Sequence, residues 1–323
     1  MNKHLINITG IVLAACVLAG CGKAGQGSPY DYHPARMDAL AESLPSDRWQ
    51  AAPFADELCV ITGDEASADS AVTARSAALF SVNNRQVLYQ KNAFDRMNPA
   101  SITKIMTALL MIKHGDLSEM VKVGDETVIT ETGASLCHIL PGETLSMEDL
   151  LYGLMLPSGN DAAAAIAVHM AGSLDAFADM MNEQARQLGA TGTHFMNPHG
   201  LTDEQHYTTA YDLYLIFNEA LKYPEFRTVI QTVSYTARYQ DAEGTEKSQT
   251  WENSNQYLNG KTPVPDGLSV MGGKTGTTSA AGSCLIMDSQ DSENNDYISV
   301  VLKAESRASL YENMTNIIQK IVN

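Results

Sequence analysis

Apolar runs near both ends of the chain predict β-strands. The segments SAALFSV, which begins at residue 76, and QVLYQKN, which begins at residue 86, are rich in strand-forming residues. Between them lie Asn83 and Asn84, which tolerate the positive φ of a tight turn, so the two segments predict a hairpin. Strand character returns in LSVMGGKTG, SCLIMDS and YISVVLKA, which begin at residues 268, 283 and 297.

Two segments with helical spacing lie between and after these strands. The run NPASITKIMTALLMI, residues 98–112, is almost entirely apolar, and it predicts a helix that Asn98 caps and Pro99 begins. RASLYENMTNIIQKIV, residues 307–322, keeps its apolar residues three or four apart and predicts a closing helix.

A third apolar segment, SMEDLLYGLMLPSGNDAAAAIAVHMAG from residue 146, predicts a helix, a break and a second helix. Ser146 and Asp149 have capping-box spacing, and the second helix runs from Asp161 to a stop at Gly172. Strands at both ends with a mostly helical middle favour one antiparallel sheet covered by helices. The sequence therefore predicts a single α+β domain, which we expect to span residues 71–323.

Composition narrows the class of protein. The chain has 323 residues, of which 44% are hydrophobic and 18% charged, so a sizeable core is expected. Its formal charge of −17 would be repelled by nucleic acid phosphates and by anionic lipid surfaces. We therefore expect no nucleic acid partner.

The first 21 residues have the order of an export signal. A short cationic start, an apolar stretch and small residues precede Cys21, and the stretch is shorter than the roughly 20 apolar residues that a membrane span needs. Leu18 to Cys21 resembles a bacterial lipobox. We expect residues 1–20 to be a lipoprotein signal peptide and Cys21 to carry lipid. Residues 21–70, rich in Gly, Ser, Pro and Asp, are expected to form a flexible tether.

Cysteines 59, 137 and 284 remain after the signal and the lipidated position are set aside. An odd number cannot all pair within the chain, and no CxxC spacing indicates a metal site. Free buried thiols are the default interpretation, with one disulfide among the three left open.

The apolar segment from residue 98 carries Ser101 and Lys104. Residues three apart share a helix face, so the hydroxyl and the amine can meet. Apolar neighbours would lower the pKa of Lys104, and a neutral amine beside a serine at a helix N-terminus suits nucleophilic catalysis. The spacing is common, however, and a lysine that extends along apolar surface to water explains it equally well.

Two further segments carry candidate chemistry. Ser158 and Asn160 lie in the break between two predicted helices, where a loop can present a hydroxyl and an amide, although turn chemistry alone favours the same residues. GGKTGTT, residues 272–278, ends a strand pattern and brings Lys274 and Thr275 to glycines that allow close approach. A phosphate-binding P-loop is excluded because Leu268 stands where that motif needs glycine.

Taken together, Ser101-x-x-Lys104, Ser158-x-Asn160 and Lys274-Thr275-Gly276 resemble the motifs of the serine penicillin-recognising enzymes. PASITKIMTALL, LLYGLMLPSGNDAAAAIA, MNPHGL and GGKTGTTSAAGSC are more specifically similar to low-molecular-mass D-alanyl-D-alanine carboxypeptidases. The resemblance runs from about residue 75 to the C-terminus. It implies a β-lactamase/transpeptidase-like fold, with a five-stranded antiparallel sheet, covering helices and a helical cluster.

The resemblance implies a role for each catalytic group. Ser101 would attack the carbonyl between the last two D-alanines of a peptidoglycan stem peptide, with Lys104 as general base. Ser158 would pass a proton to the leaving amine, in contact with Lys104 and Lys274. The backbone N–H groups of Ser101 and Thr277 would form the oxyanion hole. β-Lactams would be covalent inhibitors.

The resemblance also implies the binding groups. Asn160 would position the substrate amide, and Lys274, Thr275 and Thr277 would hold the terminal carboxylate, with Arg307 as a further cation. Many relatives have an aromatic residue or histidine in place of Thr277, and many carry a C-terminal β domain and an amphipathic anchor helix. Lipid on Cys21 would replace that anchor and hold the enzyme outside the cell membrane, facing the cell wall.

No cofactor and no metal are expected. His194, His199 and His206 lie in a loop-like stretch without the i, i+4 pairing of a helical metal site, and the family that the chain resembles uses no metal. His199, in Asn-Pro-His-Gly, is interpreted as a loop-shaping residue.

Two other functions compete with a carboxypeptidase. A class A serine β-lactamase needs a deacylating Glu-x-x-x-Asn, and residues 159–273 contain none; the nearest glutamate, Glu252, is followed at that spacing by Gln256. A lipoprotein that senses β-lactams or muropeptides without turnover could lose the proton-handling groups, but Lys104, Ser158 and Lys274 are all present. A transpeptidase would use the same acyl-enzyme with another acceptor.

Overall fold

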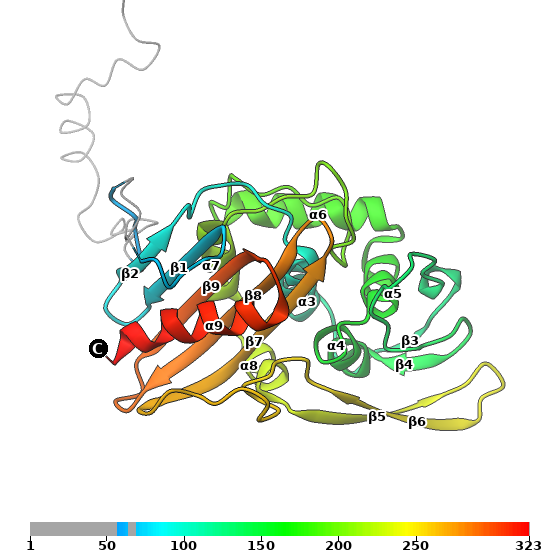
Figure 1. The fold of residues 1–323 in the computed structure, drawn as a ribbon. Coiled ribbons are helices and arrows are strands. Elements are labelled where there is room, and N and C mark those ends of the chain that lie inside the picture. Colours follow the sequence, from blue (N-terminus) through cyan, green and yellow to red (C-terminus); the bar gives the residue numbers. More distant parts are fainter. Residues whose placement is uncertain (1–56, 64–68, 323) are drawn as a thin grey trace, which may run out of the picture. The chain divides into compact units, whose positions relative to one another are not determined.

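The computed structural model describes residues 57–63 and 69–322 of the chain (Figure 1). The expected signal peptide, the expected lipidation site at Cys21 and most of the expected tether lie outside the described residues. Among the helices of the described part, none is long and apolar enough to cross a bilayer.

Strands from both ends of the chain form one antiparallel sheet, as the sequence predicted. The strand order in this sheet is β2-β1-β9-β8-β7. Its strands are β1 (Ser76–Ser81), β2 (Gln86–Lys91), β7 (Leu268–Thr278), β8 (Gly282–Asp291) and β9 (Asp296–Ala304). The helices of the described part are α3 (Lys104–His114), α4 (Met147–Met155), α5 (Asn160–Ala171), α6 (Leu174–Gln187), α7 (Ala210–Ala220), α8 (Pro224–Gln231) and α9 (Arg307–Ile318). The α+β class is confirmed.

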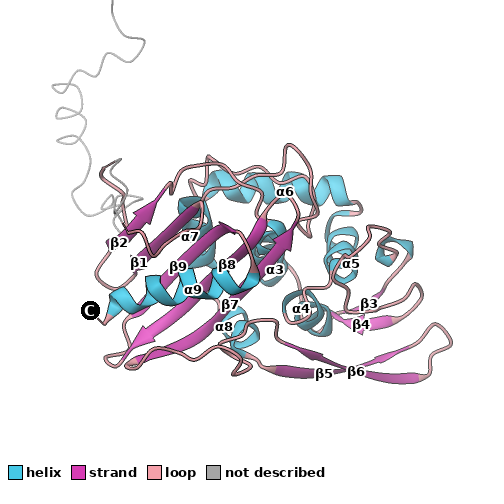
Figure 2. Ribbon diagram, viewed as in Figure 1, coloured by secondary structure: helices cyan, strands magenta, loops and turns pink. Residues whose placement is uncertain are grey.

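Helices cover both faces of this sheet (Figure 2). Because successive strand residues point to opposite faces, Ala77 and Leu79 of β1 pack with Leu310 and the other apolar residues of α9. Ala78 and Phe80 point the other way, into the larger core that contains α3 and α7. Burial on both faces explains why β1 reads as a continuous apolar run rather than an alternating one.

A second antiparallel sheet, which the sequence analysis missed, lies in the middle of the chain. It has the order β3-β4-β5-β6. Its strands are β3 (Met120–Lys122), β4 (Thr144–Ser146), β5 (Ser234–Gln240) and β6 (Glu246–Glu252). Two of these strands have three residues each, too few to show a period, and β6 reads EKSQTWE, with one buried side chain. The middle of the chain contains α3 to α8, as expected, but the sequence pattern did not predict this sheet between them.

The expected hairpin is present, but its turn differs from the prediction. The positive φ, 55°, falls on Arg85 rather than on either asparagine. Asn83 instead accepts a hydrogen bond from the backbone N–H of Asp296, at 2.6 Å, and so ties the turn to β9. The two helices expected around residues 157–160 are α4 and α5, and the Ser146 hydroxyl accepts from Asp149 N at 3.0 Å as predicted.

Residues 57–63, which the sequence placed in the tether, pack on the domain. Cys59 is fully buried; its backbone N–H donates to the Tyr214 hydroxyl at 2.8 Å, and its carbonyl accepts from the Tyr211 hydroxyl at 2.9 Å. These bonds anchor the segment at its centre. Cys59, Cys137 and Cys284 are all buried and unpaired, which confirms the default interpretation of free thiols.

We predict that Tyr214→Phe lowers the free energy of unfolding by about 1–3 kcal/mol, because it leaves the buried N–H of Cys59 without an acceptor. The phenylalanine ring would keep the stacking on Phe80, whose ring centroid lies 4.1 Å away. Tyr211→Phe is the matched control, since Tyr211 is only partly buried and water can replace its bond to Cys59. Urea unfolding measures both, and equal losses in the two variants would contradict the assigned anchor.

Candidate active site

Ser101 lies in a single 3-10 turn, Ala100–Thr103, which leads directly into α3 at Lys104. The predicted helix start was wrong in detail, because Asn98 does not cap. Its side-chain amide donates to the carbonyls of Asp203 and His206 instead, at 3.3 and 2.9 Å. Ala100 has φ +50°, a strained value that orients the turn ahead of Ser101.

A close backbone contact supports this strained turn. Gly200 has φ +88°, and a Cβ atom added to it would lie 1.9 Å from the carbonyl oxygen of Ala100. On the other side, a Cβ atom at Gly276 of β7 would lie 2.9 Å from the backbone nitrogen of Ser101. Ser101 is therefore held between two backbone segments that approach each other without intervening side chains.

Lys104 is fully buried beside Ser101. Its Nζ lies 3.1 Å from Ser101 Oγ, 2.5 Å from Asn160 Oδ1 and 2.7 Å from the backbone carbonyl oxygen of His199. Burial, and next the nearby charge of Lys274, hold the pKa of Lys104 well below its ordinary value.

The three partners of Lys104 differ in what they can offer. The oxygens of Asn160 and His199 can only accept, so they take both N–H groups of a neutral amine. In that neutral form the Nζ lone pair would be left for the Ser101 hydroxyl, 3.1 Å away, which is the one partner of the three that has a proton to donate. A neutral Lys104 in this position can remove that proton as the oxygen attacks an electrophile.

Ser158 and Lys274 form a second buried serine–lysine pair. Lys274 Nζ donates to Ser158 Oγ at 2.9 Å and to the Thr275 carbonyl at 3.1 Å. Burial lowers the pKa of Lys274 to about 7. Ser158 has φ +67°, another strained value. The sequence analysis expected Ser158 to contact Lys104 as well; among the described residues, no hydrogen bond joins them.

A cleft of about 530 Å³ opens beside these groups. Ser101, Asn160 and Thr277 line it, with residues 131–135 and 200–202 as further walls. β7 is the edge strand of its sheet, so its outer edge is available to pair with an extended ligand. Thr275 bonds through its hydroxyl to Ser254, at 2.7 Å.

Among the described residues, no hydrogen bond or ion pair joins Arg307 to Ser101, Lys104 or Lys274. Arg307 is an exposed residue at the start of α9, and it is absent from the residues that line the cleft in the described part of the chain. The sequence analysis had placed it with the carboxylate-binding groups.

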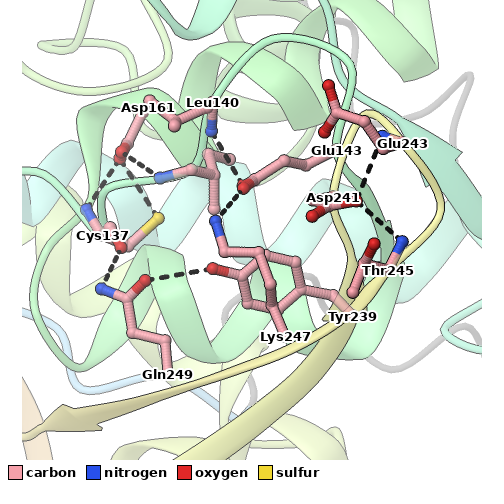
Figure 3. Close-up of polar contacts among 11 residues, drawn as sticks. Cys137, Leu140, Glu143, Asp161, Tyr239, Asp241, Glu243, Thr245, Lys247 and Gln249 are labelled. Carbon is pink, nitrogen blue, oxygen red and sulfur yellow. Dashed lines mark hydrogen bonds and ion pairs between the residues drawn. The ribbon is translucent and has the colours of Figure 1, made fainter.

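The cleft wall around residues 131–140 is held from two sides, which the sequence analysis missed (Figure 3). Asp161, in the first turn of α5, accepts from the backbone N–H groups of Cys137 and Ile139 at 2.9 and 3.2 Å. The Cys137 carbonyl accepts from the Gln249 and Trp251 side chains of β6, at 2.8 and 3.0 Å. An acidic residue next to Asn160 was interpreted only as a helix start.

The same wall has a further clamp (Figure 3). Glu143 accepts from Leu140 N at 2.9 Å and pairs with Lys247 of β6 at 2.5 Å. The second sheet thus fixes one side of the cleft, although it contributes no residue to the catalytic cluster.

The three histidines in the loop 194–206 make different contacts. His199 offers its backbone carbonyl to Lys104, and His206 Nε2 lies 2.8 Å from the Thr103 hydroxyl. Burial lowers the pKa of His199 to about 3 and that of His206 to about 4. Within the described residues, no group of three or more His, Cys, Asp or Glu side chains is arranged to hold a metal.

Comparison with known proteins gives one consistent result. Residues 63–306 match the family described as D-alanyl-D-alanine carboxypeptidase, Peptidase S11. The chain is 37% identical over 218 residues to the D-alanyl-D-alanine carboxypeptidase DacF of Bacillus subtilis, which covers 66% of this chain and 53% of DacF. It is 34% identical over 244 residues to DacC of Escherichia coli, covering 73% of this chain and 58% of DacC. The chain thus spans little more than half the length of these relatives.

Among solved structures, the Streptomyces K15 DD-transpeptidase superposes with a TM-score of 0.73 at 30% sequence identity. The superposition covers 79% of this chain and 98% of that one. The likeness confirms the transpeptidase-like fold that the sequence motifs implied.

We predict that Gly200→Ala slows any acylation of Ser101 by benzylpenicillin by about 100-fold, because the added methyl group must displace the turn that carries Ser101. Gly133→Ala is the matched control. Gly133 also lines the cleft and has φ +79°, but a Cβ atom there meets nothing within 4 Å. The rate of acylation and the unfolding free energy are measured for both, and equal effects on acylation would contradict the supporting contact.

Proposed function

The chain belongs to the D-alanyl-D-alanine carboxypeptidase family, Peptidase S11, and we propose that it is a serine D,D-carboxypeptidase acting on peptidoglycan stem peptides. The reaction would remove the terminal D-alanine through an acyl-enzyme on Ser101. The observation that carries the proposal is the environment of Lys104, a buried side chain whose Nζ lies within hydrogen-bond distance of Ser101 Oγ, Asn160 Oδ1 and the His199 carbonyl oxygen.

Acylation begins when Ser101 Oγ attacks the carbonyl carbon of the peptide bond between the two D-alanines. Lys104 takes the hydroxyl proton as the new C–O bond forms. When the C–N bond breaks, the leaving amine needs a proton, and Ser158 delivers one that Lys274, 2.9 Å away, replaces. D-Alanine leaves, and water then attacks the ester carbonyl. The proton of the water returns to Lys274 through Ser158, and Lys104 gives its proton back to Ser101 Oγ as the C–O bond of the ester breaks, which restores both lysines and the free serine.

The negative charge that develops on the carbonyl oxygen needs donors within the cleft. The backbone N–H groups of Ser101 and Thr277 are proposed for this role, each donor contributing about 3 kcal/mol to transition-state stabilisation. The proximity of β7 to Ser101 N supports this pairing, since a Cβ atom at Gly276 would lie 2.9 Å from that nitrogen.

The terminal carboxylate of the substrate would bind at Lys274, Thr275 and Thr277. Lys274 is desolvated and bonds only neutral oxygens among the described residues, so an incoming carboxylate would supply its counter-charge. Asn160, whose Oδ1 is engaged by Lys104, keeps its side-chain N–H₂ for the substrate amide carbonyl.

The N-terminal sequence and the proposed substrate both bear on where the protein acts in the cell. We propose that residues 1–20 are removed, that Cys21 is lipidated, and that the domain acts outside the cell membrane, facing the cell wall. The support is the lipobox-like Leu18 to Cys21.

Mass spectrometry of the intact protein after addition of benzylpenicillin tests the proposal. We predict one covalent adduct that persists, is absent in Ser101→Ala, and is retained in Ser135→Ala, which changes another serine of the same cleft. The unmodified enzyme should also release D-alanine from a peptide ending in D-Ala-D-Ala. An adduct that survives Ser101→Ala would contradict the assignment of the nucleophile.

The other outcomes separate the rival functions. Rapid loss of the adduct with accumulating hydrolysed penicillin would identify a β-lactamase. Transfer of the acyl group to an added amine in preference to water would identify a transpeptidase, the activity named for the similar Streptomyces protein. A stable adduct without release of D-alanine would favour a sensor.

A further inference from the structure

A second hollow, of about 780 Å³, adjoins the catalytic cleft. Ser279, just beyond the end of β7, lines both. The charged residues that line the hollow are Arg75, Asp95, Arg96, Lys303 and Glu305. They come from the loop before the nucleophile, from the segment before β1, and from the end of β9.

The charge of this hollow is opposite in sign to that of the protein. Three cationic side chains meet two carboxylates there, whereas the whole chain has a formal charge of −17. Arg75 pairs with Asp95 at 3.3 Å, and the guanidinium of Arg96 lies 4.5 Å from the centroid of the Tyr207 ring. Lys303 is exposed and forms no ion pair with any described residue.

The backbone brings two of these cations to neighbouring positions. The backbone N–H of Arg75 donates to the carbonyl oxygen of Lys303 at 3.4 Å, so these two cationic residues are neighbours through their backbones. Lys303 also has φ +55°, a strained value for a residue with a side chain. Asp95 already compensates the charge of Arg75, but the lining as a whole keeps one net positive charge and Lys303 has no ion pair among the described residues, so the arrangement favours an anionic ligand.

The direction in which the substrate would lie along β7 indicates which part of the substrate could carry that anion. In the proposed complex, the terminal carboxylate lies at Lys274 and Thr275, and the scissile carbonyl lies near Thr277. The rest of the peptide must then continue toward Thr278 and Ser279, at about 3.3 Å per residue. A peptide of a few more residues passes Ser279 and reaches the hollow that Lys303 lines.

We propose that this hollow is a subsite for the upstream part of the stem peptide, and that Lys303, which has no ion pair among the described residues, binds a free carboxylate there. The inference rests on the proposed function for the direction of the peptide. The chemical class of ligand is an acidic peptide that ends in D-Ala-D-Ala and has a side-chain or α-carboxylate two or three residues before the scissile bond.

The test compares two peptides that differ only in this group, a free carboxylate in one and its primary amide in the other. We expect the unmodified enzyme to have the higher kcat/KM for the acidic peptide, and Lys303→Gln to lower that value by about threefold to tenfold, a range typical of one exposed charge contact. Lys303→Gln should leave kcat/KM for the amidated peptide unchanged, and Lys303→Arg should keep the preference.

Lys122→Gln is the matched control, because Lys122 is an exposed lysine of β3 and its replacement by glutamine removes the same charge. Equal losses on both peptides, or the same loss in Lys122→Gln, would overturn the subsite.

Binding of the two uncleaved peptides to Ser101→Ala, with and without Lys303→Gln, separates the subsite from the catalytic proposal. A Lys303-dependent preference for the acidic peptide in the absence of any turnover by the unmodified enzyme would support the subsite while refuting the carboxypeptidase. Turnover of both peptides without a preference that depends on Lys303 would leave the carboxypeptidase and refute the subsite.

Discussion

The complete burial of two lysine side chains next to two serines is the constraint on which the rest of the site depends. Lys104 and Lys274 are at most 1% exposed, and burial lowers the pKa of each. Because the unfolded chain binds more protons than the fold between the lowered pKa of Lys104 and 10.5, stability rises with pH across that window. At neutral pH the burial of Lys104 therefore opposes folding, and the surrounding structure must compensate.

That compensation comes from segments far apart in the sequence. The 3-10 turn before α3 supplies Ser101, the first turn of α5 supplies Asn160, and the loop at His199 supplies a carbonyl oxygen. β7 supplies Lys274 from the edge of a sheet whose two faces are both packed. Strained backbone at Ala100 and Ser158 is held by these neighbours, which fits a site assembled for chemistry rather than for stability.

Much of the fold and of the candidate site could be predicted from the sequence, because the signals for these parts were local. The hairpin, the break between α4 and α5 and the closing helix follow from periodicity and turn residues, and the three motifs follow from spacing. The second sheet was missed because two of its strands have three residues and show no period, and because β6 has a single buried side chain. The acceptors of Lys104 and the Asp161 clamp depend on contacts between distant segments, and one acceptor is a backbone carbonyl, which has no sequence signal. The role of Arg307, which only the family resemblance implied, stays a prediction, because in the described part of the chain its side chain has no hydrogen bond or ion pair with the cluster around Ser101 that would test it.

The most direct test of the central claim is the titration of Lys104 itself. NMR of protein labelled with ¹³C at the lysine Cε atoms, with the signal of Lys104 assigned by its loss in Lys104→Met, reports the proton on Nζ as pH is varied. Our account predicts a midpoint well below the ordinary value of 10.5. A Lys104 that titrates at or above 10.5 would be an ammonium at the pH of the reaction, and it could not be the base that activates Ser101.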